Sequence, residues 1–325
     1  MAENIIVDDM DDGQRLDRWL KKKFPDLGFA QTQKLLRTGQ VRVDGKRSKG
    51  DTRLVSGQSV RVPPQVAQPT GQKKKRLSPR AIEYIRSMVI YEDEHLIALN
   101  KPAGIAVQGG SKITHHIDGM LDGLAVDGHK PHLVHRLDKE TSGVLLLART
   151  PKAAKKMGDL FKGREIRKYY WAITVPSPTI HHGKISSAVA KVAGRGGERM
   201  MAVDDDSGKG AVTYYSVMED LNGKVAWVVF WPRTGRMHQI RVHAAQINCP
   251  LMGDYKYGPD QSFLEENPAL PDTLHLHARR VIFRHPFAGM RVDITAPLDE
   301  EMQETFDFFH FDANNDTDPF EELEK

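Results

Sequence analysis

Residues 64–80 divide the chain into two folding units. This stretch, PQVAQPTGQKKKRLSPR, is rich in Pro, Gly, Gln and basic residues and lacks the apolar periodicity of a helix or strand. We interpret it as a linker between a small unit over about residues 14–63 and a larger unit over about residues 81–297. Its basic run either contacts phosphates or is simply solvated, and the sequence leaves both readings open.

The small unit is expected to hold two helices and a short sheet. Apolar residues recur at helical spacing over Leu16–Leu20, and a second amphipathic stretch runs over Gln31–Thr38. Alternating residues over 40–46 include an Asp-Gly turn, and Ser59–Val62 gives another strand closed by two prolines. Cations on the outer faces suit a surface laid along phosphates. The candidate phosphate-contacting residues are Arg18, Lys34, Arg37 and Arg42.

The large unit contains many strand-like runs and few helical ones. Helices are expected from Thr150, an N-cap followed by Pro at the first helical position, and over His238–Ile247. Many strands with few, unevenly spaced helices favour an α+β fold on an antiparallel or mixed sheet over alternating βαβ units. The expected strands cover Met88–Tyr91, Leu96–Leu99, Val144–Leu147, Tyr170–Val175, Val212–Val217, Trp227–Phe230 and Arg291–Ile294.

The formal net charge of +4 conceals a gradient along the chain. Residues 1–80 carry 18 Lys and Arg against 9 Asp and Glu, whereas residues 298–325 carry 11 acids against one Lys. Such asymmetry indicates a nucleic-acid-binding N-terminus and an acidic tail. We expect the tail, residues 298–325, to be solvated, mobile and dispensable for chemistry.

Composition also excludes several classes of protein. The single cysteine, Cys249, rules out an intramolecular disulfide and has no neighbouring base to activate it. The acidic N-terminus, MAENIIVDDMDDG, lacks the basic and apolar regions of a signal peptide. The longest apolar runs, near Val144–Ala148 and Ala226–Trp231, are far shorter than the roughly 20 residues that a membrane span needs. We therefore expect a soluble cytoplasmic protein.

The densest group of polar residues is HRLDKETSG at residues 135–143, directly before an apolar strand. In an extended segment Arg136 and Asp138 project to one side, and His135 and Leu137 to the other. A carboxylate beside a guanidinium stays ionised, so Asp138 is either a catalytic group or half of a structural ion pair.

Two further segments are rich in polar or aromatic side chains. Three arginines within residues 233–243 indicate anion recognition, and the histidines there lack zinc-ligand spacing, so no metal site is expected. In the strand containing Tyr169 and Tyr170, alternation points one ring into the core and the other outward or into a cleft. The glycine-rich loop over 194–197 lacks the context of a phosphate-binding P-loop.

These segments resemble the motifs of the RluA-type family of RNA pseudouridine synthases. The family signature HRLDxxTSG is similar to HRLDKETSG, and its other motifs are similar to YEDEHLIALNKPAGIAVQGG, KYYWA, TGRMHQIRVHAAQINCPLMGD and LHLHARRVIFRHP. The small unit resembles the RNA-binding module of ribosomal protein S-four. Together the resemblance covers about residues 15–63 and 88–297. It departs at Met237, where the family usually has Thr or Ser, and over the insertion-like segment Gly194–Gly210.

The resemblance implies roles for particular residues. Asp138 corresponds to the family's essential aspartate, which acts at the sugar as nucleophile or as base. Tyr170 lies under the target base, Arg241 pairs with the aspartate, and Ile240 lines the pocket. Arg136 fills the gap left by a base that has flipped out of its stack, which offsets part of a cost of a few kcal/mol. The remaining RNA-binding candidates in this unit are Arg236 and His238.

The resemblance also implies a substrate. Its RluC-like character points to uridines in large-subunit ribosomal RNA. We expect a monomer that needs neither cofactor nor metal, because the isomerisation is redox-neutral. Three alternatives remain: an RNA-binding ribosome-assembly protein with a retired active site, a pseudouridine synthase acting on tRNA, and a metal-dependent RNA hydrolase.

Overall fold

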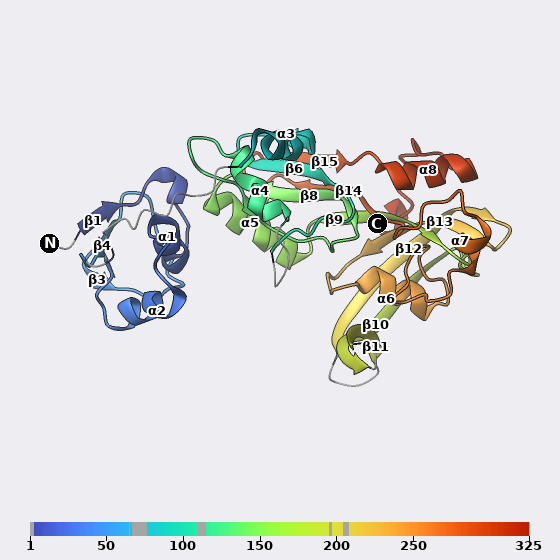
Figure 1. Ribbon diagram of the computed structural model, residues 1–325, viewed down its shortest axis with the longest axis horizontal. Helices are drawn as coiled ribbons and strands as arrows, with labels where there is room; N and C mark the ends of the chain where they lie inside the picture. Colours follow the sequence, from blue (N-terminus) through green and yellow to red (C-terminus); the bar gives the residue numbers. More distant parts are fainter. Residues whose placement is uncertain are drawn as a thin grey trace.

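The N-terminal module is a four-stranded antiparallel sheet packed against two helices. In the computed structural model, which describes residues 3–64, 66, 77–109, 115–194, 197–203 and 208–324, it forms a separate body at one end of the molecule (Figure 1). The strand order is β1-β4-β2-β3. The elements are β1 (Glu3–Ile6), α1 (Leu16–Lys23), α2 (Phe29–Arg37), β2 (Arg42–Val43), β3 (Lys46–Arg47) and β4 (Ser59–Val62).

The predicted helices and hairpin of this module are present, but the predicted start at residue 14 is wrong. Strand β1 pairs with β4 from Glu3 to Ile6 and so belongs to the same sheet. The module has its own apolar core around Trp19 and Leu20, both fully buried. The Trp19 indole N–H donates to Asp11 Oδ2 at 3.0 Å, and Lys22 Nζ donates to Asp11 Oδ1 at 2.6 Å. These contacts satisfy a buried carboxylate and tie α1 to the start of the chain.

The large domain is built on one mixed sheet of eleven strands. The order is β11-β10-β12-β13-β9-β14-β8-β6-β5, with β15 paired to β14 and β7 paired to β8. Strands β14 and β8 run parallel, and the other pairs are antiparallel. The mixed sheet confirms the predicted α+β class. The strands are β5 (Val89–Glu92), β6 (Leu96–Lys101), β7 (His132–Leu133), β8 (Ser142–Ala148), β9 (Arg167–Thr174), β10 (His182–Gly194), β11 (Gly197–Val203), β12 (Lys209–Leu221), β13 (Val225–Pro232), β14 (Leu276–Arg284) and β15 (Arg291–Thr295).

Helices cover the sheet at a few places. The predicted N-cap is confirmed at α5, where Ala153 N–H donates to Thr150 Oγ1 at 3.1 Å, and the predicted helix after His238 is α6. Helix α3 begins at Pro79, so the domain starts inside the predicted linker, whose residues 65 and 67–76 lie outside the described part of the chain. The helices are α3 (Pro79–Ser87), α4 (Ile117–Met120), α5 (Pro151–Gly163), α6 (Gln239–Gln246), α7 (Ser262–Glu266) and α8 (Glu300–Phe309).

The acidic C-terminal segment is part of the fold, so the expectation of a mobile tail is wrong for its described residues. Helix α8 and the chain after it place Phe306, Phe311 and Phe320 in the same core cluster as Trp171 and Trp227 of the sheet. Phe306 is fully buried and stacks on Trp171 with ring centroids 5.5 Å apart. Aromatic burial of this kind outweighs the solvation of the surrounding acids.

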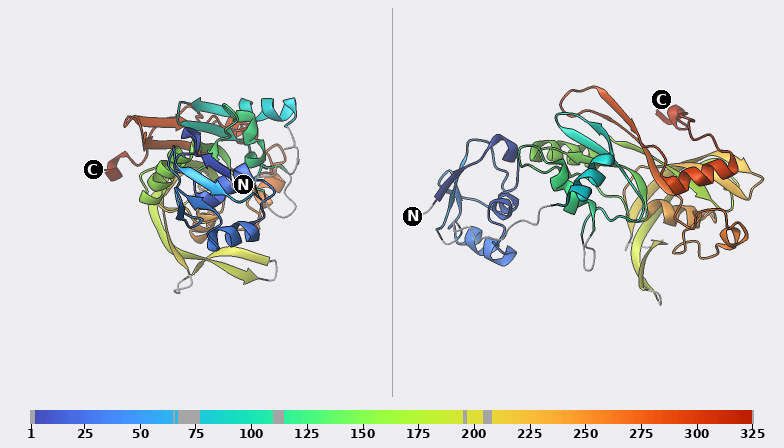
Figure 2. Two further views of the ribbon diagram at one scale, coloured as in Figure 1. Left: turned by 90° about the vertical axis from the view of Figure 1, so that its left-hand side faces the viewer. Right: turned by 45° about the horizontal axis from the view of Figure 1, so that its top comes forward.

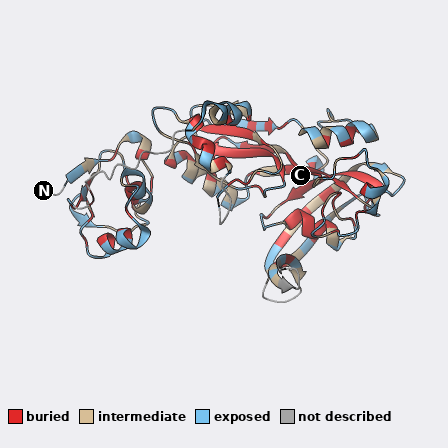
Figure 3. Cartoon of the chain, in the orientation of Figure 1, coloured by how far each residue is buried: buried red, intermediate tan, exposed pale blue. Residues whose placement is uncertain are grey.

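The two bodies meet along one edge of the large domain, next to the start of α5 (Figure 2). Lys22 Nζ lies 3.0 Å from His129 Nδ1, and Lys152 Nζ lies 3.8 Å from Asp12. The insertion-like segment Gly194–Gly210 is mostly strand in its described part, because β10 and β11 form a hairpin that curves away from the body of the sheet. Buried residues concentrate in the central strands (Figure 3). Over the described residues, no helix has the length and apolar character to cross a membrane.

Candidate active site

The loop between β7 and β8 carries the predicted catalytic residue and is fixed at both ends. Gly143 has φ +102°, and a Cβ there would lie 2.3 Å from the Ala278 carbonyl oxygen of β14, so only glycine fits. Within the loop, Thr141 N–H donates to the Asp138 carbonyl at 3.2 Å. The chain therefore turns sharply into the buried strand β8 directly after Asp138.

A buried lysine holds this loop from beneath. Lys101 is fully buried, and its Nζ donates to the carbonyls of Pro102, Ile105 and Lys139 at 2.8, 2.9 and 3.0 Å. Burial lowers the pKa of Lys101 to about 8, although the carboxylates of Glu140 and Asp138 oppose that shift. Three carbonyl acceptors satisfy the ammonium and join the end of β6 to the loop. In the sequence, Lys101 is part of a family motif, and nothing there indicates this structural role.

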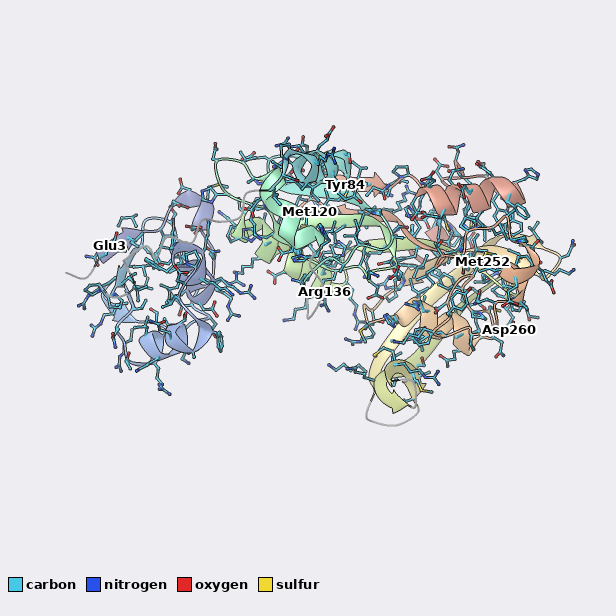
Figure 4. All side chains as sticks on the ribbon, viewed as in Figure 1. Glu3, Tyr84, Met120, Arg136, Met252 and Asp260 are labelled. Atoms are coloured by element: carbon cyan, nitrogen blue, oxygen red, sulfur yellow. The ribbon has the colours of Figure 1, made fainter. Side chains whose placement is uncertain are left out.

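His135 is directed inward from the same loop. Its Nε2 accepts the Leu146 N–H at 2.8 Å, and burial lowers the pKa of His135 to about 3. The neutral imidazole of His135 therefore ties the loop to β8. Arg136 is exposed, and Figure 4 shows it at the lower face of the large domain. The side chain of Asp138 is 38% exposed.

Asp138 opens into a cavity of about 810 Å³. Its walls come from the Asp138 loop, from the start of β9 and from the segment between β13 and α6. The predicted residues Arg136, Tyr170, Arg236, His238, Ile240 and Arg241 all line it together with Asp138. Segments more than 100 residues apart in sequence thus form one site.

The charge of the cavity wall is one-sided. Among the described residues that line it, Asp138 is the only Asp or Glu, against eight Lys and Arg. The cations are Arg136, Lys139, Lys162, Arg164, Lys168, Arg233, Arg236 and Arg241. Such a wall attracts a polyanion and brings it to a single carboxylate.

The paired tyrosines of β9 face opposite sides of the sheet, as strand alternation predicts. Tyr169 is buried in the core, and its hydroxyl donates to Asp318 Oδ2 of the C-terminal segment at 2.8 Å. Tyr170 lines the cavity instead. Burial raises the pKa of Tyr170 well above its ordinary value of 10, and the charge of Asp138 adds to that rise. Tyr170 therefore presents a neutral ring and hydroxyl to whatever enters.

Arg241 does not form the predicted ion pair with Asp138. Its Nε and Nη2 donate to Asp254 at 2.7 and 2.6 Å, a bidentate pair in which the Asp254 side chain is fully buried. Asp254 also accepts the N–H groups of Lys256 and Tyr257, each at 3.1 Å. Arg241 interacts with Asp138 only through space, as a minor influence. Its direct partner is a carboxylate that the sequence reasoning did not single out.

The imidazole of His238 lies beside Asp138. Its Nε2 lies 3.9 Å from Asp138 Oδ2, and its Nδ1 lies 2.7 Å from the Tyr257 hydroxyl. That hydroxyl also accepts the Met200 N–H at 3.3 Å. When it donates its own hydrogen to Nδ1, the proton of the neutral ring is on Nε2, facing Asp138. Burial lowers the pKa of His238, although the charge of Asp138 opposes that shift.

The turn before α6 is held by a buried amide. Gln239 Oε1 accepts from the Thr234 hydroxyl at 2.8 Å and from Arg236 N–H at 3.0 Å. Its Nε2 donates to the Val212 carbonyl at 3.0 Å and to Thr213 Oγ1 at 2.9 Å. All four polar bonds fix the backbone that carries Arg236 and His238, while Met237, the departure from the family pattern, is exposed.

The RNA-contacting candidates of the N-terminal module differ among themselves. Arg18, Lys34 and Arg37 are exposed on the two helices. Arg42 instead donates to the carbonyls of Gly39 and Gly45, each at 3.2 Å, and so supports the hairpin. No group of three His, Cys, Asp or Glu in the part of the chain that the structure describes has the geometry to hold a metal ion.

Taken together, the sheet and its loops form a cation-rich cavity with one described carboxylate, Asp138, and one tyrosine ring, Tyr170. The family model for RNA pseudouridylate synthase matches residues 95–246, which include that loop, β9 and α6. The chain belongs to the RNA pseudouridine synthase family, in its RluA-like branch, as the resemblance implied.

Relatives and solved structures agree with this assignment. A Rickettsia typhi protein named ribosomal large subunit pseudouridine synthase C is 37% identical over 87% of this chain and 93% of its own length. The protein of the same name from Escherichia coli is 33% identical over 90% of this chain and 91% of its own. The structure named human RNA pseudouridylate synthase domain containing 4 has a TM-score of 0.60 and 29% identity, covering 70% of this chain and 95% of that one.

Proposed function

We propose that this protein isomerises uridines of large-subunit ribosomal RNA to pseudouridine and that Asp138 carries the chemistry. The observation that carries the assignment of Asp138 is its position as the only carboxylate lining the cation-rich cavity. The proposal for the substrate draws on the names of the relatives, which span nearly the whole chain. An N-terminal module with exposed cations supports binding to a large, structured RNA.

The reaction rearranges bonds without adding or removing atoms. The bond between uracil N1 and the ribose carbon C1′ breaks, the base turns, and a bond forms between ring carbon C5 and C1′. The proton leaves C5 and N1 gains one, so the product is an isomer. The carboxylate of Asp138 acts at the sugar, either as a nucleophile on C1′ or as a base.

Other residues of the cavity prepare the nucleotide. Tyr170 offers its ring for stacking on the flipped uracil, and Ile240 supplies an apolar wall. Arg136, exposed at the mouth, is suited to fill the gap in the stack and offset part of the few kcal/mol that flipping costs. Arg236 and His238 face the same space from the turn before α6. A ribosomal RNA substrate implies work in the cytoplasm, and we propose a monomer that uses neither metal nor cofactor.

Mapping of pseudouridines tests this function. Large-subunit ribosomal RNA from cells lacking the gene should lack pseudouridine at defined positions. The wild-type gene should restore those positions, and an Asp138→Asn gene expressed at the same level should not. Loss confined to tRNA would favour the tRNA alternative. Cells with full modification but defective ribosome assembly would favour an RNA-binding protein with a retired active site.

A further inference from the structure

One cation of the cavity wall, Lys168, differs from the others in its surroundings. The rest are either paired within the protein or exposed. Arg241 is held by Asp254, Lys139 pairs with Glu140 at 3.0 Å, Arg233 stacks on Trp231 at 4.6 Å, Arg236 donates to the Gly210 carbonyl at 3.3 Å, and Arg136, Lys162 and Arg164 are exposed. Each of these has a protein partner or free access to water.

Lys168 has neither. Its side chain is partly buried, and among the described residues no carboxylate, carbonyl or hydroxyl lies within hydrogen-bonding or ion-pairing distance of its ammonium. Burial is the sole cause of a lowered pKa for Lys168, with no anion to offset it. A partly buried cation without a counter-charge is unfavourable, and a purely structural position avoids this by carrying an apolar side chain.

The location of this ammonium is defined from two sides. Its Nζ lies 3.9 Å from the position that a Cβ on Gly235 would occupy, so it sits against the turn before α6. Its charge also contributes to the lowered pKa of His135, after burial, so it lies near the Asp138 loop. Gly235 leaves the approach to the ammonium open on that side, because a larger residue would stand against it.

Strand alternation sets the relation of Lys168 to the site of chemistry. Lys168 and Tyr170 are two residues apart on β9 and point to the same face, about 7 Å apart along the strand. Both line the cavity, while Tyr169 between them enters the core. A single nucleotide whose base lies on Tyr170 is long enough to bring one of its phosphates to Lys168.

We propose that Lys168 binds a phosphate group flanking the uridine that enters the cavity, and that this phosphate is the counter-charge the protein lacks. The inference rests on the proposed function in taking a uridine-containing RNA as the ligand. Charge-assisted contact with phosphate favours the protonated amine, so binding raises the pKa of Lys168 back toward its ordinary value. The same contact sets the depth to which the nucleotide enters and so aligns its sugar with Asp138.

The test compares Lys168→Met with wild type in binding a uridine-containing hairpin RNA over a range of salt. Loss of one phosphate contact should weaken binding about tenfold at ~0.1 M salt and reduce the slope of log affinity against log salt by about 0.7–0.9. At alkaline pH, wild type should take up protons on binding, measured by calorimetry in buffers of different ionisation enthalpy, and Lys168→Met should not.

Two control variants and a stability measurement separate the loss of a phosphate contact from other effects of the substitution. Lys168→Arg retains the charge and should keep the salt slope. Lys156→Met is the matched control, since Lys156 donates to the Pro286 carbonyl at 2.7 Å outside the cavity, and should behave as wild type. Thermal melting of Lys168→Met should show a domain no less stable than wild type, because a partly buried cation without a counter-charge has been removed.

Wild-type affinity, salt slope and proton uptake in Lys168→Met would overturn the proposal. So would a Lys168→Arg variant that loses the salt slope as fully as Lys168→Met does. Conversion of the same RNA is scored separately: a wild-type protein that binds the hairpin with the expected slope but converts no uridine in ribosomal RNA counts against the proposed function, not against the phosphate contact.

Discussion

The N-terminal module and the large domain are both rich in cations, but only the large domain also holds some of them buried and paired. On the module, Arg18, Lys34 and Arg37 are exposed to solvent. In the large domain, Lys101 is buried under three carbonyls and Arg241 is clamped by a buried carboxylate. Exposed cations exchange counterions with RNA and contribute affinity that falls with salt. Buried ones contribute geometry, because their positions are set before RNA arrives.

The largest effect is expected from breaking the buried pair of the large domain. Arg241→Met leaves Asp254 ionised, buried and unpaired, which should lower the free energy of unfolding by about 3–5 kcal/mol. The matched change on the module is Arg15→Met, which breaks an exposed pair with Asp17 and should leave the free energy of unfolding nearly unchanged. Chemical denaturation of both variants checks this. Equal, small losses would show that the Arg241 pair contributes no more than a surface contact.

The stability of the two regions should respond differently to acid. All fourteen histidines lie beyond residue 94, and none is in the module. Burial lowers the pKa of His275 to about 4 and that of His135 to about 3, against 6.5 for the unfolded side chain. Because these folded-state pKa values are depressed, the unfolded chain binds more protons below pH 6.5. Stability of the large domain should therefore fall by about 1.4 kcal/mol per pH unit for each such histidine between pH 6.5 and about 4.

The module should resist that range of pH. Burial raises the pKa of Asp11, but the hydrogen bond and charge of Lys22 bring it below the ordinary value of 3.8. The ionised Asp11 carboxylate therefore stabilises the module above pH 3.8, and this contribution is lost only at lower pH. Hydrogen exchange resolved by segment should thus show the large domain losing protection near pH 5 while α1 and α2 keep theirs. Simultaneous loss in both regions would contradict this difference.

Removal of the module is expected to weaken binding without removing the chemistry. A chain starting at residue 77 should bind ribosomal RNA about 10- to 100-fold more weakly at ~0.1 M salt, with a shallower salt slope, because several phosphate contacts are lost. At saturating RNA it should convert uridine at close to the wild-type rate. Undiminished affinity and slope in the shortened chain would show that the exposed cations of the module are merely solvated.

The smallest effect is expected at the hydroxyl that orients His238. Tyr257→Phe removes the hydrogen bond to His238 Nδ1 and frees the ring to change tautomer, which should slow conversion about tenfold. Tyr255→Phe is the matched control, because its hydroxyl donates to Asp272 at 2.6 Å on the exposed surface. RNA affinity should not change in either variant. A Tyr257→Phe enzyme with wild-type rate would mean that the tautomer of His238 does not matter to turnover.

Much of the fold could be predicted because its signals are local. The strands at Leu96–Lys101, Ser142–Ala148 and Val225–Pro232 are continuous apolar runs, and they were expected at nearly these positions. Strand β14 was not expected, since HARRVIFR mixes charge with apolar residues and buries His277 through contacts from other strands. The acidic composition of residues 298–325 likewise hid the phenylalanines that pack into the core.

The residues of the site could be predicted from motifs, but the ion pairs that they form could not. Motifs place Asp138, Tyr170, His238 and Arg241 in one family pattern, and the structure brings them into one cavity. Which carboxylate takes Arg241 depends on the turn that positions Asp254, thirteen residues further on, and no periodicity encodes that choice. The sequence also does not predict that Lys168 has no partner among the described residues, because that depends on how the cavity is packed.

Single-turnover conversion by Asp138→Asn at saturating RNA is the most direct test of whether Asp138 carries the chemistry. The amide is nearly isosteric but acts neither as nucleophile nor as base at the sugar. We predict conversion no faster than background, with an RNA dissociation constant within about threefold of wild type, a change of under 1 kcal/mol. Glu140→Gln, two residues away on the same exposed loop, should convert normally. Conversion by Asp138→Asn within about tenfold of the wild-type rate, or 1.4 kcal/mol of barrier, would contradict the assignment of the chemistry to this carboxylate.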